Sequence, residues 1–143
     1  MSKATWQDAQ FILQLYEMRR EPRMREARAF IAGPFKARTF DDFLKLCPMG
    51  SAENASFRQV TSYWDMVCAI VRRDLTDREL FFETNGELTV VWEKVRHLTP
   101  EYRTRFKAPL FLENLEQVAA EREAWLGVKM PGYLTALRER LGL

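Results

Sequence analysis

The sequence predicts an all-α fold: a single-domain helical bundle of about six or seven helices around a buried central helix at about residues 52–73. Three observations indicate this fold. Glycine and proline fall between the apolar stretches and almost never within them. Residues that can cap a helix stand at the starts of several segments. Inside the segments, apolar residues recur at spacings of three and four, as they do on one face of a helix.

The composition is that of one globular domain, which we expect to span residues 1–143. Hydrophobic residues make up 47% of the chain and charged residues 29%, so the chain can bury a core and should not be disordered. Uncharged stretches are much shorter than the roughly 20 residues that span a membrane. The N-terminus lacks the basic and apolar regions of a secretory signal, so a cytoplasmic location is expected.

The first expected helix runs from about Trp6 to Arg20, and Thr5 and Asp8 are placed to cap its first turn. Four apolar residues of this helix are expected to face the core: Ala9, Ile12, Leu13 and Tyr16. Pro22 is expected to start the second helix, because proline lacks only an N–H that a first turn leaves unpaired anyway. The apolar stripe of the second helix consists of Met24, Ala27, Phe30 and Ile31.

The central helix is expected at about 52–73, with Ser51 as its N-cap. Before it, Thr39 and Asp42 mark the start of a shorter helix. The central helix carries large apolar residues at spacings of three and four: Phe57, Val60, Trp64, Val67, Cys68 and Val71. Its polar residues form only a narrow strip, so this helix is expected to be buried on most sides.

Thr76 and Glu79 fit a capping box and mark the next helix, which should end at the Asn85-Gly86 turn. A further apolar stripe follows the turn: Leu88, Val91, Trp92, Val95 and Leu98. This stripe fits the helical period better than the alternation of a strand. It is expected to turn three polar residues outward: Glu93, Lys94 and His97.

The last third of the chain continues the helical pattern. Thr99 followed by Pro100 marks another helix start, with proline at the first helical position. Two more apolar stripes follow, the first made by Phe111, Leu115, Val118 and Trp125, and the second by Leu134, Leu137 and Leu141. These segments complete the expected bundle.

The residue types that carry most enzyme chemistry are scarce. His97 is the only histidine, so a site that needs two imidazoles, such as the di-iron centre of ferritin-like bundles, cannot form within one chain. Cys47 and Cys68 lack the neighbouring cations that would lower a thiol pKa, and we expect both to be reduced thiols in the core. No glycine pattern for phosphate binding is present. We therefore expect no catalytic, cofactor-binding or metal-binding residues, and no enzyme activity.

Basic residues are concentrated between Glu17 and Arg38. This segment has seven arginine and lysine residues against three glutamates, a net charge of +4, which leaves −2 for the remainder because the whole chain carries +2. Five arginines are candidates for contact with nucleic acid: Arg19, Arg20, Arg23, Arg25 and Arg28. The helical spacing turns Arg25 and Arg28 to solvent. Because no nucleic-acid-binding module or stacking aromatics accompany them, we favour an ordinary solvated helix face.

Two stretches resemble a bacterial family of short proteins classed as a domain of unknown function. They are LYEMRREPRMREARAFI at residues 15–31 and YWDMVCAIVRRDLTDRELFFETNGELTVVWEKVRHLTPEYR at residues 63–103. The resembling features are a first helix that ends in basic residues, a proline near the start of the next helix, and a Trp-bearing helix after an acidic one. Asp74 stands where the family pattern has glycine. The resemblance implies a helical fold and assigns no activity.

The function expected from the sequence is that of a non-catalytic protein-interaction module, with self-association into a homodimer as one form of it. The basic segment 17–38 and the acidic segment 74–87 are complementary, and the C-terminal apolar stripe is available to a second chain. Alternatively, the two charged segments face each other within one chain. A second hypothesis is a nucleic-acid-associated regulator that uses the five arginines. An enzyme acting on a small molecule has no support besides pockets between helices.

Overall fold

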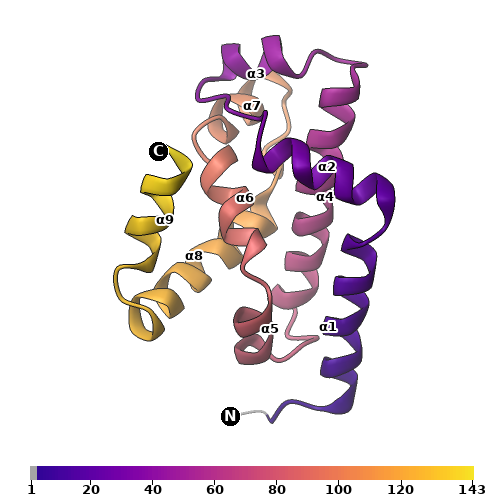
Figure 1. Cartoon of the computed structure of the whole chain (residues 1–143), viewed down its shortest axis with the longest axis vertical. Coiled ribbons are helices and arrows are strands. Elements are labelled where there is room, and N and C mark those ends of the chain that lie inside the picture. The colour runs from indigo at the N-terminus through magenta and orange to yellow at the C-terminus, as the bar shows by residue number, and fades with distance from the viewer. Residues whose placement is uncertain (1–2) are drawn as a thin grey trace.

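A computed structural model describes residues 3–143 of the chain (Figure 1). This part folds into nine α-helices and contains no strand, which confirms the predicted all-α class. No helix among these residues combines the length and apolar character that crossing a membrane requires. In chain order the helices are α1 (Trp6–Arg19), α2 (Pro22–Ala32), α3 (Phe40–Leu46), α4 (Ala52–Arg72), α5 (Arg78–Thr84), α6 (Glu87–Val95), α7 (Thr99–Arg105), α8 (Glu113–Lys129) and α9 (Tyr133–Leu141).

The prediction of about six or seven helices was too low, because three of the nine helices in residues 3–143 are short. Helices α3, α5 and α7 have seven residues each, or about two turns. A helix of this length has too few apolar positions to reveal a stripe in the sequence. In isolation it is also unstable, so packing on the longer helices holds it.

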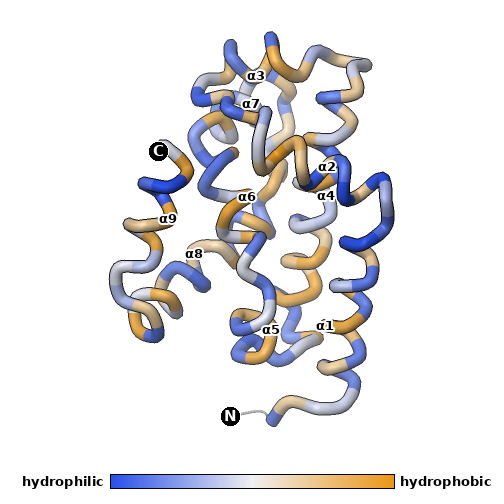
Figure 2. The backbone as a smooth tube through the Cα atoms, viewed as in Figure 1, coloured by the Kyte–Doolittle hydropathy of each residue, from blue (hydrophilic) through white to orange (hydrophobic). Residues whose placement is uncertain are grey.

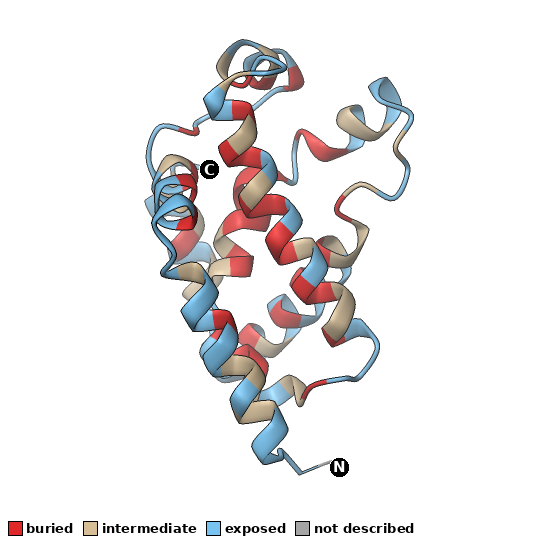
Figure 3. Ribbon diagram, turned by 90° about the vertical axis from the view of Figure 1, so that its right-hand side faces the viewer, coloured by how far each residue is buried: buried red, intermediate tan, exposed pale blue. Residues whose placement is uncertain are grey.

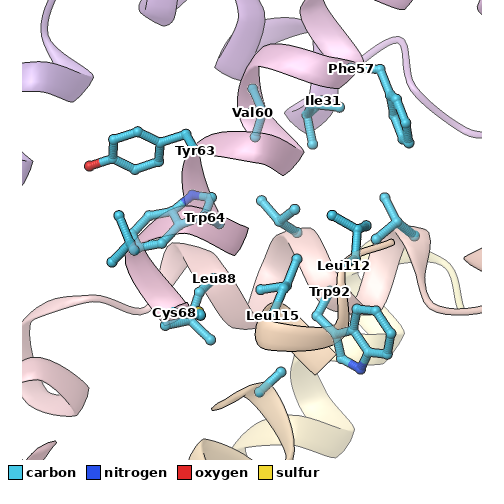
Figure 4. Packing of buried hydrophobic residues seen from close by; sticks show 14 of the residues in the cluster. Ile31, Phe57, Val60, Tyr63, Trp64, Cys68, Leu88, Trp92, Leu112 and Leu115 are labelled. Atoms are coloured by element: carbon cyan, nitrogen blue, oxygen red, sulfur yellow. The ribbon is translucent and has the colours of Figure 1, made fainter. Parts of the chain in front are cut away.

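Helix α4 is the centre of the bundle, as predicted. Its 21 residues follow Ser51, whose Oγ accepts a hydrogen bond from the Asn54 amide at 3.1 Å. It contacts α2, α6 and α8. Figure 4 shows that side chains from these helices meet in one core, where Val60 and Trp64 of α4 are fully buried. The expected stripe of α4 is therefore confirmed.

Helix α6 is buried on nearly all sides, because α4, α8 and α9 all contact it. The expectation that Glu93 and Lys94 face outward is wrong, since both residues are buried. His97, which lies just after the helix, is exposed as expected. Figure 2 shows α6 between α9 and α4, with hydrophobic residues interspersed among hydrophilic ones. Periodicity indicates one apolar stripe, whereas a helix surrounded by neighbours also buries the polar residues beside that stripe.

Helix α1 turns a different face to the core than the sequence predicted. Leu15 is buried, whereas Leu13 and Tyr16, which were expected in the core, are exposed. Phe11 and Ile12 pack against the core on the same side as Leu15. The helix therefore carries apolar residues on two faces, and their spacing alone does not determine which face is covered.

Side-chain caps define several helix ends. The predicted caps of α1 and α3 are confirmed as reciprocal capping boxes, formed by Thr5 with Asp8 and by Thr39 with Asp42. At α5 the prediction is wrong by one residue, because Asp77 rather than Thr76 accepts the hydrogen bond from the first turn. At α7, Thr99 is already the first helical residue and does not act as the cap. Helix boundaries commonly differ by one residue between descriptions, and these shifts leave the architecture unchanged.

Candidate interaction surface

An exposed line of large side chains runs along α1, and we name it the α1 outer face. It consists of Trp6, Leu13, Tyr16 and Arg20. Trp6, Leu13 and Tyr16 are 71%, 62% and 54% exposed, and the guanidinium of Arg20 lies 5.5 Å from the centre of the Tyr16 ring. Spacings of seven, three and four residues place all four on one side of the helix, as in the seam of a coiled coil. Figure 3 views the molecule from the α1 side, where this helix is mostly exposed.

Two hydrogen bonds to other parts of the chain, from Asp77 and from Tyr63, fix the rotation of α1 about its axis. The carboxylate of Asp8 accepts from the Thr5 amide at 2.7 Å and from the Asp77 amide, before α5, at 2.9 Å. The hydroxyl of Tyr63 in α4 donates to the Leu15 carbonyl at 3.0 Å. The amides of Thr5 and Asp77 lower the pKa of Asp8, because they bond to its charged form. This arrangement turns Leu15 inward and leaves the α1 outer face to solvent.

Two of the five candidate nucleic-acid-binding arginines point into the protein. The guanidinium of Arg19 lies 5.3 Å from the centre of the Trp64 ring, and it donates to the Asn85 side chain at 2.9 Å. Arg28 forms an ion pair with Glu87, with 2.7 Å between its Nη2 atom and a carboxylate oxygen. The expectation that Arg28 faces solvent is therefore wrong. Its partner lies 59 positions further along the chain, so helical spacing could not reveal the pair.

The other three candidate arginines lie at the surface among carboxylates. Arg23 forms an ion pair with Glu26 at 3.2 Å. Arg20 and Arg25 line a shallow groove together with two acidic residues, Glu17 and Glu21. The five arginines are therefore not presented together to solvent. A phosphate backbone at this groove would meet as many carboxylates as guanidinium groups.

The basic and acidic segments meet within one chain at Glu87. This carboxylate accepts from Arg28 and also from the indole nitrogen of Trp64, at 3.0 Å. The hydrogen bonds to Glu87 raise the pKa of Arg28. The C-terminal stripe is likewise used inside the chain, because Leu137 of α9 is buried. The complementary charged segments and the C-terminal apolar stripe, which suggested contact with a second chain, are thus at least partly used within one chain.

Several buried charged side chains hold the helices together. Glu93 forms ion pairs with Arg96 and with Arg138 of α9, at 3.1 and 2.9 Å. Lys94 donates to the last carbonyls of α2, and burial lowers its pKa. Arg122 of α8 donates twice to the Phe82 carbonyl near the end of α5. Cations at helix C-termini complement the helix dipole, so these groups have a structural role.

The residues with reactive side chains are placed as follows. Cys47 and Cys68 are free thiols and buried, as predicted. Burial raises the pKa of Cys47 to about 11 and also raises the pKa of Cys68. The Nε2 atom of His97 lies 2.8 Å from the Ala37 carbonyl. In the described part of the chain, no three residues among His, Cys, Asp and Glu are grouped so that they could hold a metal ion.

Comparison with known proteins gives one match. A family model described as a domain of unknown function, DUF4760, matches residues 4–125, which include the α1 outer face and all helices from α1 to α7. No curated protein and no solved structure matches the chain significantly. The match carries no catalytic or binding residue to this sequence, so a function has to be inferred from the surface and its chemistry.

Proposed function

The chain belongs to the DUF4760 family, a domain of unknown function, and we propose that it is a non-catalytic module that binds protein through the α1 outer face. The observation that carries this proposal is the exposure of Trp6, Leu13 and Tyr16 along one line of the helix. Contiguous apolar side chains on a protein surface mark contact sites, and Trp, Tyr and Arg dominate the binding energy of such sites. The α1 outer face combines all three.

The partner we propose is a second copy of the chain, with the two α1 helices packed antiparallel about a twofold axis. In this arrangement Leu13 lies near the axis, and Arg20 of one copy approaches Trp6 of the other, where a guanidinium and an indole attract each other. The two helix dipoles then oppose each other. A parallel pair would instead bring the two Arg20 guanidinium groups together. Charge and side-chain chemistry therefore favour the antiparallel pair.

The proposed interface is small. Helix α1 has 14 residues, so it is about 21 Å long, and a pair of such helices buries less than a standard protein interface. We therefore expect weak association that depends on concentration. Because the α1 outer face is mostly apolar, the dimer should persist at high salt. A dimer held by the basic and acidic segments would instead dissociate at high salt, because salt screens the charges.

Sedimentation velocity over a concentration series from micromolar to millimolar tests this proposal. The wild-type chain should dimerise at the upper end at both low and high salt, and Leu13→Glu should be monomeric throughout. Leu110→Glu is the matched control, because Leu110 is similarly exposed but lies between α7 and α8. A wild-type monomer at every concentration, or equal effects of the two substitutions, would contradict the proposal.

The absence of catalysis and the cytoplasmic location are parts of the same proposal. Both thiols are buried, and burial raises their pKa values, so neither side chain is a ready nucleophile. Free buried thiols also fit a reducing compartment such as the cytoplasm. These observations support a binding role over an enzymatic one.

The nucleic-acid alternative has less support, and it stays a prediction from the sequence. Among the five arginines, Arg19 and Arg28 bond to other parts of the chain, and Arg23 pairs with Glu26. Titration with duplex and single-stranded DNA at low salt would test it, since phosphate contacts are strongest there. We expect no binding.

A further inference from the structure

A groove with aromatic walls lies at the end of the molecule formed by α3 and α7, and we name it the aromatic groove. Figure 1 places α3 and α7 at the top of the view, away from the N-terminal end of α1. Its volume is about 400 Å³, which falls in the range of small-molecule sites. Four aromatic rings line it: Phe43, Tyr102, Phe106 and Phe111. Tyr102 is central among them, 3.7 Å from Phe111, 4.6 Å from Phe106 and 5.8 Å from Phe43 between ring centres.

One cation lines this otherwise mostly apolar groove. The Nε of Arg58 in α4 donates to the Asn54 side chain at 2.9 Å, and that side chain donates in turn to the Cys47 carbonyl at 3.0 Å. Asn54 is only 4% exposed, so it anchors the Nε atom of the exposed Arg58 at the edge of the groove. Within residues 3–143, no carboxylate lies within ion-pair distance of Arg58, and its two terminal nitrogens donate to no acceptor.

The chemistry of the aromatic groove matches one class of ligand. A planar guanidinium with free terminal nitrogens binds a carboxylate through two parallel hydrogen bonds. Aromatic rings offer an apolar surface and preferred stacking positions to a hydrocarbon or aryl group. Arg58 and Tyr102 both line the aromatic groove, so a ligand bound there can meet the guanidinium and the phenol ring together.

We propose that the aromatic groove binds a small organic carboxylic acid with an apolar tail. The carboxylate pairs with the terminal nitrogens of Arg58, and the tail lies among Phe43, Tyr102 and Phe106. This site is separate from the α1 outer face, so it does not depend on the protein-binding role.

Ligand-observed NMR titrations with 4-phenylbutanoate and decanoate test the proposal, because they distinguish an aryl tail from an alkyl tail. At least one of the two acids should bind, and the neutral alcohol 4-phenylbutan-1-ol and the tail-less acetate should bind at least about tenfold more weakly. In the spectrum of the labelled protein, the Arg58 Nε–H signal should shift on addition of the acid.

Substitutions test the guanidinium and the aromatic lining of the groove separately. Arg58→Gln should weaken binding of the acid by about tenfold or more and leave that of the alcohol unchanged. Arg72→Gln is the matched control, since Arg72 lies on the same helix, is exposed and also donates to an asparagine, Asn114, but lies outside the groove. Phe106→Ala, at the exposed rim, should weaken binding of acid and alcohol alike.

Several results would overturn the proposal. These are no binding of either acid at millimolar concentration, equal binding of acid and alcohol, and equal affinities of wild type and Arg58→Gln. Circular dichroism should first establish that Arg58→Gln is folded, because it loses the bond to Asn54. If it is not folded, Phe106→Ala and the shift of the Arg58 signal decide the question on the folded chain.

Discussion

Asp8 joins two segments that are distant in the sequence. Its carboxylate caps the first turn of α1 through Thr5 and also accepts from the Asp77 amide at the start of α5. Because both amides bond to the charged form, they lower the pKa of Asp8 in the folded protein. The orientation of α1, and with it the α1 outer face, therefore depends partly on one ionised side chain, together with the bond from Tyr63 to the Leu15 carbonyl.

This lowered pKa makes stability depend on pH in a defined direction. Above the unfolded-state pKa of about 3.9, Asp8 is ionised in both states and its full contribution to stability is present. As the pH falls through the lower folded-state pKa, this contribution is lost. Asp8→Asn should therefore be less stable than wild type at neutral pH, and the difference should shrink in acid. Urea unfolding followed by circular dichroism, from neutral pH to about pH 3, measures this difference.

Asp41→Asn is the control for this comparison, because Asp41 is also an exposed carboxylate in the first turn of a helix. It should change stability little at any pH, since its effect is limited to the helix dipole. A difference between wild type and Asp8→Asn that stays constant with pH would show that the charge of Asp8 has no role.

At the residue scale, the sequence predicts capping residues better than buried charges. The partners of a cap lie three residues apart, so Thr5 with Asp8 was visible in the sequence. Glu93 was placed outside because its partner Arg138 lies 45 positions away, and Arg28 was placed outside for the same reason. Whether a charged residue is buried depends on distant partners that no local spacing reveals.

At the scale of the element, α1 poses the sharpest question, because it has two apolar faces. Leu15 is buried and Leu13 is exposed, although they are only two positions apart. Leu15→Ala should lower the free energy of unfolding by about 2–5 kcal/mol, because it leaves a cavity. Leu13→Ala should lower it by less than about 0.5 kcal/mol, because the side chain is already in water. Urea denaturation at low protein concentration, where the chain is monomeric, measures both.

The two substitutions are controls for each other, since both remove the same atoms from the same helix. Equal losses would mean that the inward face of α1 is not the one that contains Leu15. The sequence allowed either face, because Leu13, Tyr16 and Trp6 follow the helical period as well as Phe11 and Leu15 do. The sequence did contain one signal of a surface role, namely two apolar faces on the same helix. A helix at the edge of a bundle packs only one face against its neighbours, so the other apolar face stays exposed.

At the scale of the whole molecule, the fold was predicted from the buried stripe of α4, and the arrangement of the other helices was not. Apolar spacing and caps give the number of long helices and their places in the sequence, but the short helices α3, α5 and α7 are held by their neighbours. The aromatic groove also emerges only in three dimensions, because Phe43, Arg58 and Tyr102 come from three different helices. Sequence spacing within one helix cannot reveal such a site.

Helix α9 lies at the periphery, where it contacts α6 and α8 only weakly compared with the contacts of α4 (Figure 1). A chain that ends at Met130 should therefore still fold, since most of the buried side chains belong to α1 to α8. It should lose about 3 kcal/mol of stability, because it loses the buried Leu137 and one of the two cations that pair with Glu93.

Adding Glu93→Gln to this shortened chain should recover part of the loss, because a neutral amide needs no counter-ion in the interior. The same substitution in the full chain should instead be destabilising, since there it would leave Arg138 without its partner Glu93. Urea unfolding of four chains, with and without α9 and with glutamate or glutamine at position 93, measures the free energy of unfolding of each. The effect of Glu93→Gln should have opposite signs in the full and the shortened chain. If Glu93→Gln destabilised the full and the shortened chain equally, the charge of Glu93 would not couple α9 to the bundle. Packing of Leu137 would then account for the docking of α9.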